Sequence, residues 1–257
     1  MVIDFSTITI YEVIALILSF IAIMIPIVQW AWNKWIVKPV LELLTTGKIN
    51  LYFNRSGSYL GIESVYEAIN KPITVKHIAL KLTRCRDEKK LNQVWSSFWS
   101  PITQRFSGNY SSTIEGAHPF RIEKNSITTA FTEFEDLHNT LQRSLVKFDK
   151  DVDFFIKECL DKMLPFNETV EKFEQQSFFK NMKDILLQEF FWDIGKYKIE
   201  ILVKYDETEK SFAYEFEINE AEHNKLMHNL KETLLVPLKQ AYKLPLGFQA
   251  VTLKLDD

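Results

Sequence analysis

The sequence predicts an α+β protein in which one N-terminal transmembrane helix precedes a cytoplasmic antiparallel β-sandwich with an inserted αα-hairpin and a C-terminal helix plus strand. Three patterns support this prediction. They are an uncharged apolar run at residues 13–32, a series of β-branched segments separated by turn residues, and two stretches of helical periodicity. The chain has 257 residues, of which 46% are hydrophobic, so it is ample for a packed core.

Composition narrows the class of protein. The formal net charge of −3 is too small for a whole-protein nucleic-acid binder, and the seven glycines argue against glycine-built nucleotide cradles. The two cysteines, Cys85 and Cys159, cannot form a dense disulfide framework, which fits a reducing compartment. A composition rich in Ile, Lys, Phe and Asn is typical of a low-GC bacterium.

The apolar run at residues 13–32 contains no charged residue. Twenty residues at helical rise span about 30 Å, which is the thickness of a bilayer core. The twelve residues before it contain neither Lys nor Arg, and no small-residue cleavage site follows, so a cleavable signal peptide is not predicted. Residues 1–12 are therefore expected to form a short extracytoplasmic N-terminus.

Basic residues occur on only one side of this run, where Lys34, Lys38 and Lys48 follow it. Because basic flanks stay in the cytoplasm, we expect an inner (plasma) membrane protein with its N-terminus outside and its C-terminal domain in the cytoplasm. The expected interface anchors are two of these lysines and an aromatic belt: Trp30, Trp32, Trp35, Lys34 and Lys38.

The smaller and polar positions of the run follow a regular spacing of 4, 3, 4 and 3 residues: Ala15, Ser19, Ala22, Pro26 and Gln29. Such a repeat lies along one side of a helix, where small residues allow close approach of a second helix. It predicts a homo-oligomer or a membrane hetero-complex. The alternative is a monomeric anchor with a chance pattern.

Residues 33–48 are expected to form a juxtamembrane connector, either a brief interfacial helix or a stiff link ended by Thr45-Thr46-Gly47. The cytoplasmic domain then occupies residues 49–257. Its first part contains strand-like segments at 49–54, 59–69, 73–84, 91–99 and 120–136. The polar run 107–113 is expected to be a loop.

A helical insertion is expected at residues 138–191. Apolar residues from Leu141 to Cys159 follow helical spacing, Leu164-Pro165 ends that helix, and a second helix starts near Asn167. Two helices joined by a tight break form an αα-hairpin. A last helix is expected from Glu220 to about Leu244, followed by a strand over Phe248–Leu255.

The segment Trp192–Ile218 predicts a hairpin with one buried and one solvent-exposed face. Tyr197, Ile199, Ile201, Val203 and Tyr205 share the apolar face, whereas Lys198 and Glu200 lie opposite. With a Gly before its Tyr-led strand, this segment resembles the closing hairpin of immunoglobulin-like or arrestin-like sandwiches. The resemblance covers about a tenth of the chain; it implies a fold class and no functional residue.

No catalytic, cofactor-binding or metal site is predicted, because the sequence has no P-loop, no G-x-S-x-G elbow, no Rossmann fingerprint and no HExxH motif. His118 is either a catalytic base oriented by Glu115 or a turn histidine. Glu133, Glu135 and Asp136 are either a cation clamp or the charges of an exposed strand edge.

Eight basic residues against two acidic ones lie between Lys71 and Arg105. The candidate anionic-ligand patch within this region is Arg84, Arg86, Lys89 and Lys90. It would meet lipid headgroups, a phosphate-bearing ligand or an acidic protein, or it is a solvated hairpin tip. Nucleic acid is disfavoured, since no aromatic residues are interleaved with these charges at the tip.

Three functions remain. The first is a non-enzymatic binding or sensing module that is anchored by one membrane helix and assembles through it. The second is a membrane-disrupting effector with the general plan of bacterial defence proteins, whose assembled helices breach the bilayer. The third is a hydrolase whose site leaves no local motif.

Overall fold

The computed structural model describes residues 9–100, 113–135 and 140–256. The loop expected at 107–113 therefore lies outside the described residues, apart from its last residue. The described strands are β1 (Val40–Asn54), β2 (Gly57–Ile69), β3 (Ile73–Arg84), β4 (Lys90–Ser100), β5 (Thr113–Gly116), β6 (Phe120–Ile122), β7 (Ser126–Glu135), β8 (Gly195–Tyr205), β9 (Thr208–Ile218) and β10 (Val251–Lys254). The described α-helices are α1 (Ile10–Ala31), α2 (Thr140–Asp161), α3 (Phe166–Glu174), α4 (Ser177–Glu189) and α5 (Glu220–Ala241).

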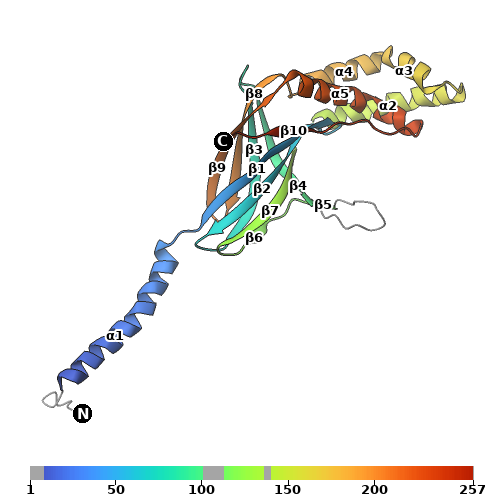
Figure 1. Ribbon diagram of the computed structural model, residues 1–257. Coiled ribbons are helices and arrows are strands. Elements are labelled where there is room, and N and C mark those ends of the chain that lie inside the picture. Colours follow the sequence, from blue (N-terminus) through green and yellow to red (C-terminus); the bar gives the residue numbers. More distant parts are fainter. Residues whose placement is uncertain (1–8, 101–112, 136–139, 257) are drawn as a thin grey trace.

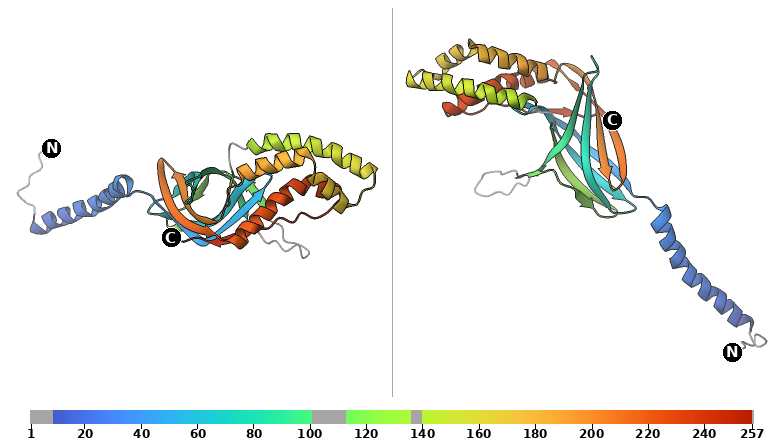
Figure 2. Two further views of the ribbon diagram at one scale, coloured as in Figure 1. Left: turned by 90° about the horizontal axis from the view of Figure 1, so that it is seen from above. Right: turned by 180° about the vertical axis from the view of Figure 1, so that it is seen from behind.

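The protein is α+β, with an apolar N-terminal helix and an antiparallel sheet, as the sequence predicted. The ten described strands form one sheet with the main order β10-β1-β2-β7-β4-β3-β8-β9, whereas a sandwich has two. This sheet curls into a nearly closed barrel (Figure 1, Figure 2). The expected sandwich is thus not what the described strands form. Both architectures require the same inside–outside alternation along each strand, so alternation alone cannot separate them.

Short contacts join the two ends of the sheet. Next to β10, the backbones of Glu215 and Asp256 exchange two hydrogen bonds of 2.9 Å. Nearer α1, side chains of β9 reach β1: Lys210 Nζ donates to the Leu41 carbonyl oxygen at 2.7 Å, and Tyr214 Oη donates to that of Leu43 at 3.4 Å. The C-terminal strand therefore completes the barrel between the first strand and β9.

The hairpin of β8 and β9 places its residues as the sequence predicted. Ile199, Ile201 and Val203 are at most 1% exposed inside the barrel. Lys198 is exposed on the outer face and pairs with Glu215 across the hairpin. The turn falls at residues 206–207, where Asp206 adopts a positive φ of 45°.

The connector expected at 33–48 is shorter in the structure, because β1 already begins at Val40. Leu41 and Leu43 point into the core, and β1 pairs with β2 from its first residue. The Thr45-Thr46-Gly47 segment is an irregularity within this strand, not its start. Gly47 has a φ of +74°, a conformation that glycine tolerates, and the register with β2 shifts between Thr45 and Ile49.

The insertion between β7 and β8 contains three described helices, α2, α3 and α4, where two were expected. The second expected helix breaks at residues 175–176, between α3 and α4. Together with α5 these helices lie at the end of the barrel opposite α1 (Figure 1). The break lets Phe173 contact both Phe178 and Phe179 of α4, with ring centroids 5.8 and 5.1 Å apart.

The last helix, α5, ends at Ala241 and not near Leu244, and the strand after it is only β10. Two buried polar residues of α5, Asn229 and Glu232, bind the segment that connects α5 to β10. The Asn229 side chain bonds the backbone N–H and carbonyl of Gln249, each at 2.7 Å. Glu232 accepts from the Gly247 N–H at 2.8 Å and from Lys239 Nζ.

The first helix stands apart from the barrel (Figure 1). None of its residues is buried, and by length and composition it can cross a membrane. A π-helical turn, Trp32–Ile36, continues it toward β1. Lys71 Nζ donates to the Lys34 carbonyl oxygen at 3.2 Å, which ties the β2–β3 turn to this junction.

The buried face of β8 gives a test of the register. Replacing Ile201 with Ala should lower the free energy of unfolding by about 2–5 kcal/mol, because it leaves a cavity inside the barrel. Replacing Lys198 with Ala, on the outer face, should change it by less than about 0.5 kcal/mol. Denaturant unfolding of the detergent-solubilised chain measures both, and equal effects would contradict this register.

Candidate functional site

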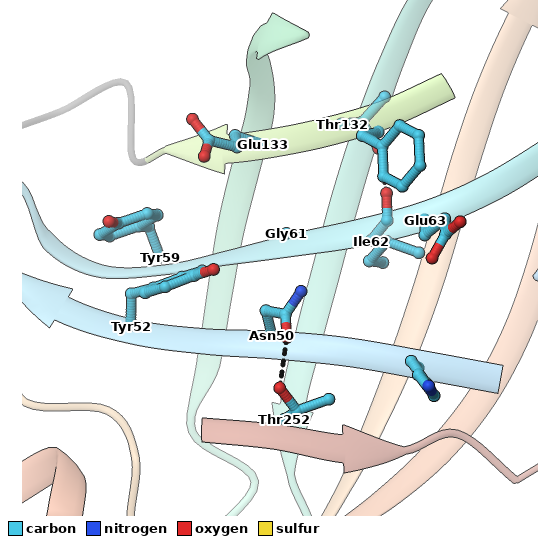
Figure 3. Close-up of a pocket in the computed structure, with 11 residues that line it drawn as sticks. Asn50, Tyr52, Tyr59, Gly61, Ile62, Glu63, Thr132, Glu133 and Thr252 are labelled. Atoms are coloured by element: carbon cyan, nitrogen blue, oxygen red, sulfur yellow. Dashed lines mark hydrogen bonds between the residues drawn. The ribbon is translucent and has the colours of Figure 1, made fainter. Parts of the chain in front are cut away.

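The outer face of the sheet has a hollow of about 260 Å³ across β10, β1, β2 and β7 (Figure 3). Its centre is Gly61 on β2. In the same cross-strand row, Asn50 lies on one side of Gly61 and Glu133 on the other. Along β2 the outward neighbours are Tyr59 and Glu63. Gly61 is thus a position without a side chain among neighbours that have one.

The backbone does not require a glycine at this point. Gly61 has an ordinary strand conformation, and a Cβ atom built there would meet no atom closer than 3.8 Å. Glycine in a strand interior costs roughly 0.5–1 kcal/mol relative to alanine. Its effect here is to leave the space above β2 open.

Two tyrosines form one wall of the hollow. Tyr52 and Tyr59 pair across β1 and β2, and their rings stack with centroids 4.8 Å apart and planes 13° apart. Both are half-buried, and burial followed by the charge of Glu133 raises the pKa of each phenol above its ordinary value. The wall is therefore aromatic, neutral and in a negative field.

Hydrogen bonds hold two polar side chains of the lining, Glu133 and Asn50. Glu133 accepts a 2.8 Å hydrogen bond from Ser97 Oγ, which leaves its other oxygen for a ligand. Asn50 Oδ1 accepts from Thr252 Oγ1 at 2.6 Å. The Glu63 side chain has no hydrogen bond or ion pair with any described residue. Stacking surfaces beside carboxylate acceptors suit reversible binding of a small polar group.

Glu133 is one of the three acidic residues for which the sequence left two roles open. The strand-edge role does not apply to Glu133, which pairs with Gly61 of β2 on one side and with Ser97 of β4 on the other. Glu135, the last residue of β7, is exposed and pairs with Val94 of β4. Asp136 lies outside the described residues. Among the described residues no group of three His, Cys, Asp or Glu is placed to hold a metal ion.

Some residues of the predicted anionic-ligand patch are occupied by contacts within the protein. Arg84 is only 8% exposed; it donates to both oxygens of Asp87 and to the Phe191 carbonyl oxygen. Arg86 pairs with Asp193 at 2.6 Å. The Arg84 guanidinium holds the pKa of Asp87 well below its usual range. Lys89 and Lys90 remain exposed, although Lys89 Nζ also reaches the Gln188 carbonyl oxygen at 3.3 Å.

This patch lies at the helical end of the barrel, far from α1. Arg84 ends β3, whose first residue Ile73 follows the turn tied to the α1 junction. Twelve strand residues span about 40 Å. The patch and the first helix are thus at opposite ends of the domain (Figure 1).

The residues predicted to act in the membrane all lie on α1 or just after it. Ser19 Oγ donates to the Ala15 carbonyl oxygen at 2.8 Å, so its hydroxyl is satisfied within the helix. The Gln29 amide has no partner among the described residues. Ala22 and Pro26 are exposed on the same helix. Trp30 and Trp35 pack edge-on at 5.8 Å, and Lys34 lies over the Trp30 ring at 4.8 Å. Trp32 is also exposed, and the Lys38 carbonyl accepts from the Asn70 amide.

His118 lies in an exposed turn. Its Nδ1 is 3.0 Å from the Gly116 carbonyl oxygen, and its ring packs against Phe98. Glu115 makes no contact with it among the described interactions. This geometry is that of a turn histidine.

Sequence reasoning missed the hollow. The available signal was the outward series Tyr59, Gly61 and Glu63 on a strand whose other face is buried. A glycine between an aromatic and an acidic residue on a solvent-exposed face is a gap in that face. Its other walls come from β1 and β7, and their register with β2 was needed to see it.

The contacts of Arg84 predict unequal roles within the basic patch. Replacing Arg84 with Ala should lower the free energy of unfolding by about 1–3 kcal/mol, because alanine cannot replace the two hydrogen bonds to Asp87 and the buried one to the Phe191 carbonyl oxygen. Replacing Lys90 with Ala should change it by less than about 0.5 kcal/mol. Denaturant titration of both variants checks this, and an Arg84 variant as stable as the parent would refute the structural role.

No protein-family model matches the chain, and no curated protein matches it. One solved structure that matches is a family 123 glycoside hydrolase from Clostridium perfringens, described for its hydrolysis of glycolipid glycans. The identity is 12% and the TM-score 0.31, over 71% of this chain and 27% of that one. The chain thus spans about a quarter of that protein's length, and a likeness this distant carries no argument about fold or activity.

Proposed function

We propose that this protein is a single-pass, membrane-anchored binding or sensing module without enzymatic activity, whose cytoplasmic barrel recognises a ligand and whose first helix assembles copies. The observation that carries the anchoring is α1 itself. Its 22 residues bury none of their side chains against the domain. At 1.5 Å per residue they span about 33 Å, enough for a bilayer core.

The junction after α1 supports the proposed orientation. Lys34 and Lys38 lie on the domain side of the helix, and Lys71 from the β2–β3 turn joins them there. Trp30, Trp32 and Trp35 lie beside these lysines, as aromatic residues do at a membrane interface. Basic residues are retained in the cytoplasm, so the barrel is proposed to be cytoplasmic and α1 to sit in the inner membrane.

Assembly through α1 is supported by the side of the helix that carries Ala15, Ser19, Ala22, Pro26 and Gln29. Ser19 adds little bulk, because its hydroxyl folds back onto the helix. Lipid gives apolar helices no hydrophobic reason to associate, so packing of small residues and a shared amide contact must supply the attraction. The Gln29 amide, without a partner in the described chain, is the group that gains most from a second helix.

The position of the basic patch bears on its partner. Headgroups of the membrane that holds α1 would be about 40 Å away, several times the Debye length of about 8 Å at physiological salt. A soluble anionic ligand or an acidic protein is therefore favoured over lipid for Lys89 and Lys90. The same end of the domain carries the four helices α2–α5.

The second candidate is the membrane-disrupting effector, favoured by the polar groups Ser19 and Gln29 on the assembling side of α1. It shares the assembly step and adds a loss of the membrane barrier. A dye-permeability assay on cells expressing the chain separates the two, because a binding module leaves the membrane tight.

Topology gives a direct test. A reporter fused after Asp257 should behave as cytoplasmic, because Lys34 and Lys38 hold the domain side of α1 inside. Paired alkaline phosphatase and fluorescent protein fusions measure this. A periplasmic signal from the C-terminal fusion would overturn the proposed orientation.

The assembling side of α1 gives a second test. Replacing Ser19 and Ala22 together with Leu should block close helix approach and weaken association by about 1–2 kcal/mol, while leucine keeps the helix soluble in lipid. The matched control replaces Ile21 and Ile25, which lie off this side, with Leu. Particle mass in mild detergent and crosslinking in membranes report the result. Unchanged assembly of the Ser19/Ala22 variant would leave assembly to the domain or a monomeric anchor.

A further inference from the structure

We propose that the hollow around Gly61 binds an organic cation, an ammonium or guanidinium group seated against the Tyr52–Tyr59 pair beside Glu133. This inference deepens the proposed function, because it rests on the barrel being a binding module and names the chemical class of ligand. The hollow lies entirely on the described strands of the sheet (Figure 3).

The shape of the hollow is set by strand register. Gly61 leaves an opening in the outer face, and all four immediate neighbours on that face carry side chains. The Tyr52 ring leans toward the opening, since its Cε2 would be 3.9 Å from a Cβ atom on Gly61. A volume of about 260 Å³ is small for a drug-sized ligand but accommodates a charged head with a short aliphatic stem.

The charges of the hollow favour a positive ligand at its tyrosine end. Glu133 faces both tyrosines, and its second oxygen is not used by Ser97. Glu135, one residue pair further along β7, adds to the negative field at Tyr59. Among the described residues that line the hollow, the one cation is Lys48, which precedes Asn50 by two residues on β1, whereas Tyr52 follows Asn50 by two. A phosphate or carboxylate would meet repulsion at the tyrosine end.

The aromatic wall gives a bound cation a second source of attraction besides the carboxylates. Ring faces carry negative electrostatic potential, so a cation gains from Tyr52 and Tyr59 as well as from Glu133. Burial and the acidic neighbours also keep both phenols protonated. A hydrated metal ion would use little of this surface, and the described residues offer it no set of three ligands.

Two sources supply this chemistry: a free polyamine, or a lysine or arginine side chain of another protein. Both place the same charged group over the tyrosines. A free amine must fit its whole length into the hollow, whereas a protein side chain enters from outside. Their binding to the chain can therefore be compared directly.

The experiment uses the full chain in lipid nanodiscs and isothermal titration calorimetry at low salt. The probes are spermidine, an acetylated and amidated tri-arginine peptide, and maltose as an uncharged control. We expect one or both cationic probes to bind and maltose not to bind. Spermidine binding alone identifies a free amine, and peptide binding alone identifies a protein side chain.

Two variants probe the hollow itself. Glu133→Gln removes the charge but keeps an acceptor for Ser97, and it should weaken binding at least tenfold. Gly61→Leu fills the opening and should abolish binding. The matched controls on β2 are Glu67→Gln and Val65→Leu, which change the same outer face away from the hollow and should leave affinity within twofold. If the leucine variant fails to fold, Gly61→Ala takes its place in the binding measurement, because its added methyl group has room around it.

Three results would overturn the inference: no binding of either cation to the parent, equal binding by the Glu133 and Glu67 variants, or preferential binding of maltose. Particle mass is measured on the same samples. If cation binding fails while assembly persists, this inference falls and the membrane-anchored assembly stands. If assembly fails while binding persists, the reverse holds.

Discussion

Closure of the sheet is the constraint on which the rest of this structure depends. The buried side chains of the described sheet are mostly apolar, and they avoid water because the sheet curls until β9 meets the chain just after β10. Backbone pairing of Glu215 with Asp256 and the side-chain bonds of Lys210 and Tyr214 join its two ends. The helices α2–α5 lie at one end of the barrel, and the junction with α1 lies at the other (Figure 1).

The proposed function places the barrel and α1 in different solvents. In the proposed arrangement α1 meets lipid, the hollow around Gly61 meets water on the side of the barrel, and the basic patch lies farthest from the membrane. Contact between the Lys71 side chain and the Lys34 carbonyl links the barrel to the segment that follows α1. A ligand on the outer face thus lies on strands that are continuous with that junction, since β1 and β2 line both.

Much of the fold could be predicted from sequence because alternation is a local property. The strands around Leu80, Ile201 and Tyr214 follow their period of two, and α5 begins at Glu220 as the sequence predicted. What local pattern could not supply was long-range pairing. A sandwich and a barrel bury the same alternate residues, so the choice between them lay in the contact of β10 with both β1 and β9. The start of β1 was missed because Thr45-Thr46-Gly47 has the composition of a turn.

The candidate site also depends on long-range pairing that local sequence patterns do not predict. Tyr59, Gly61 and Glu63 belong to one predicted strand, but Glu133 lies about seventy residues away and joins them only through the pairing of β2 with β7. The composition of the chain predicted the basic patch, but it could not predict the hydrogen bonds that Arg84 makes within the fold. Arg84 belongs to the fold because Phe191 and Asp193, far along the chain, approach it at the helical end.

The pairing of β1 with β10 also has a consequence for biosynthesis. The first strand of the barrel leaves the ribosome almost two hundred residues before the strand that covers its free edge. At about 5–20 residues per second, translation leaves that edge without its partner for roughly 10–40 s. Unpaired strand edges recruit other chains, so in the proposed membrane assembly neighbouring nascent copies are exposed to exchange of their C-terminal strands.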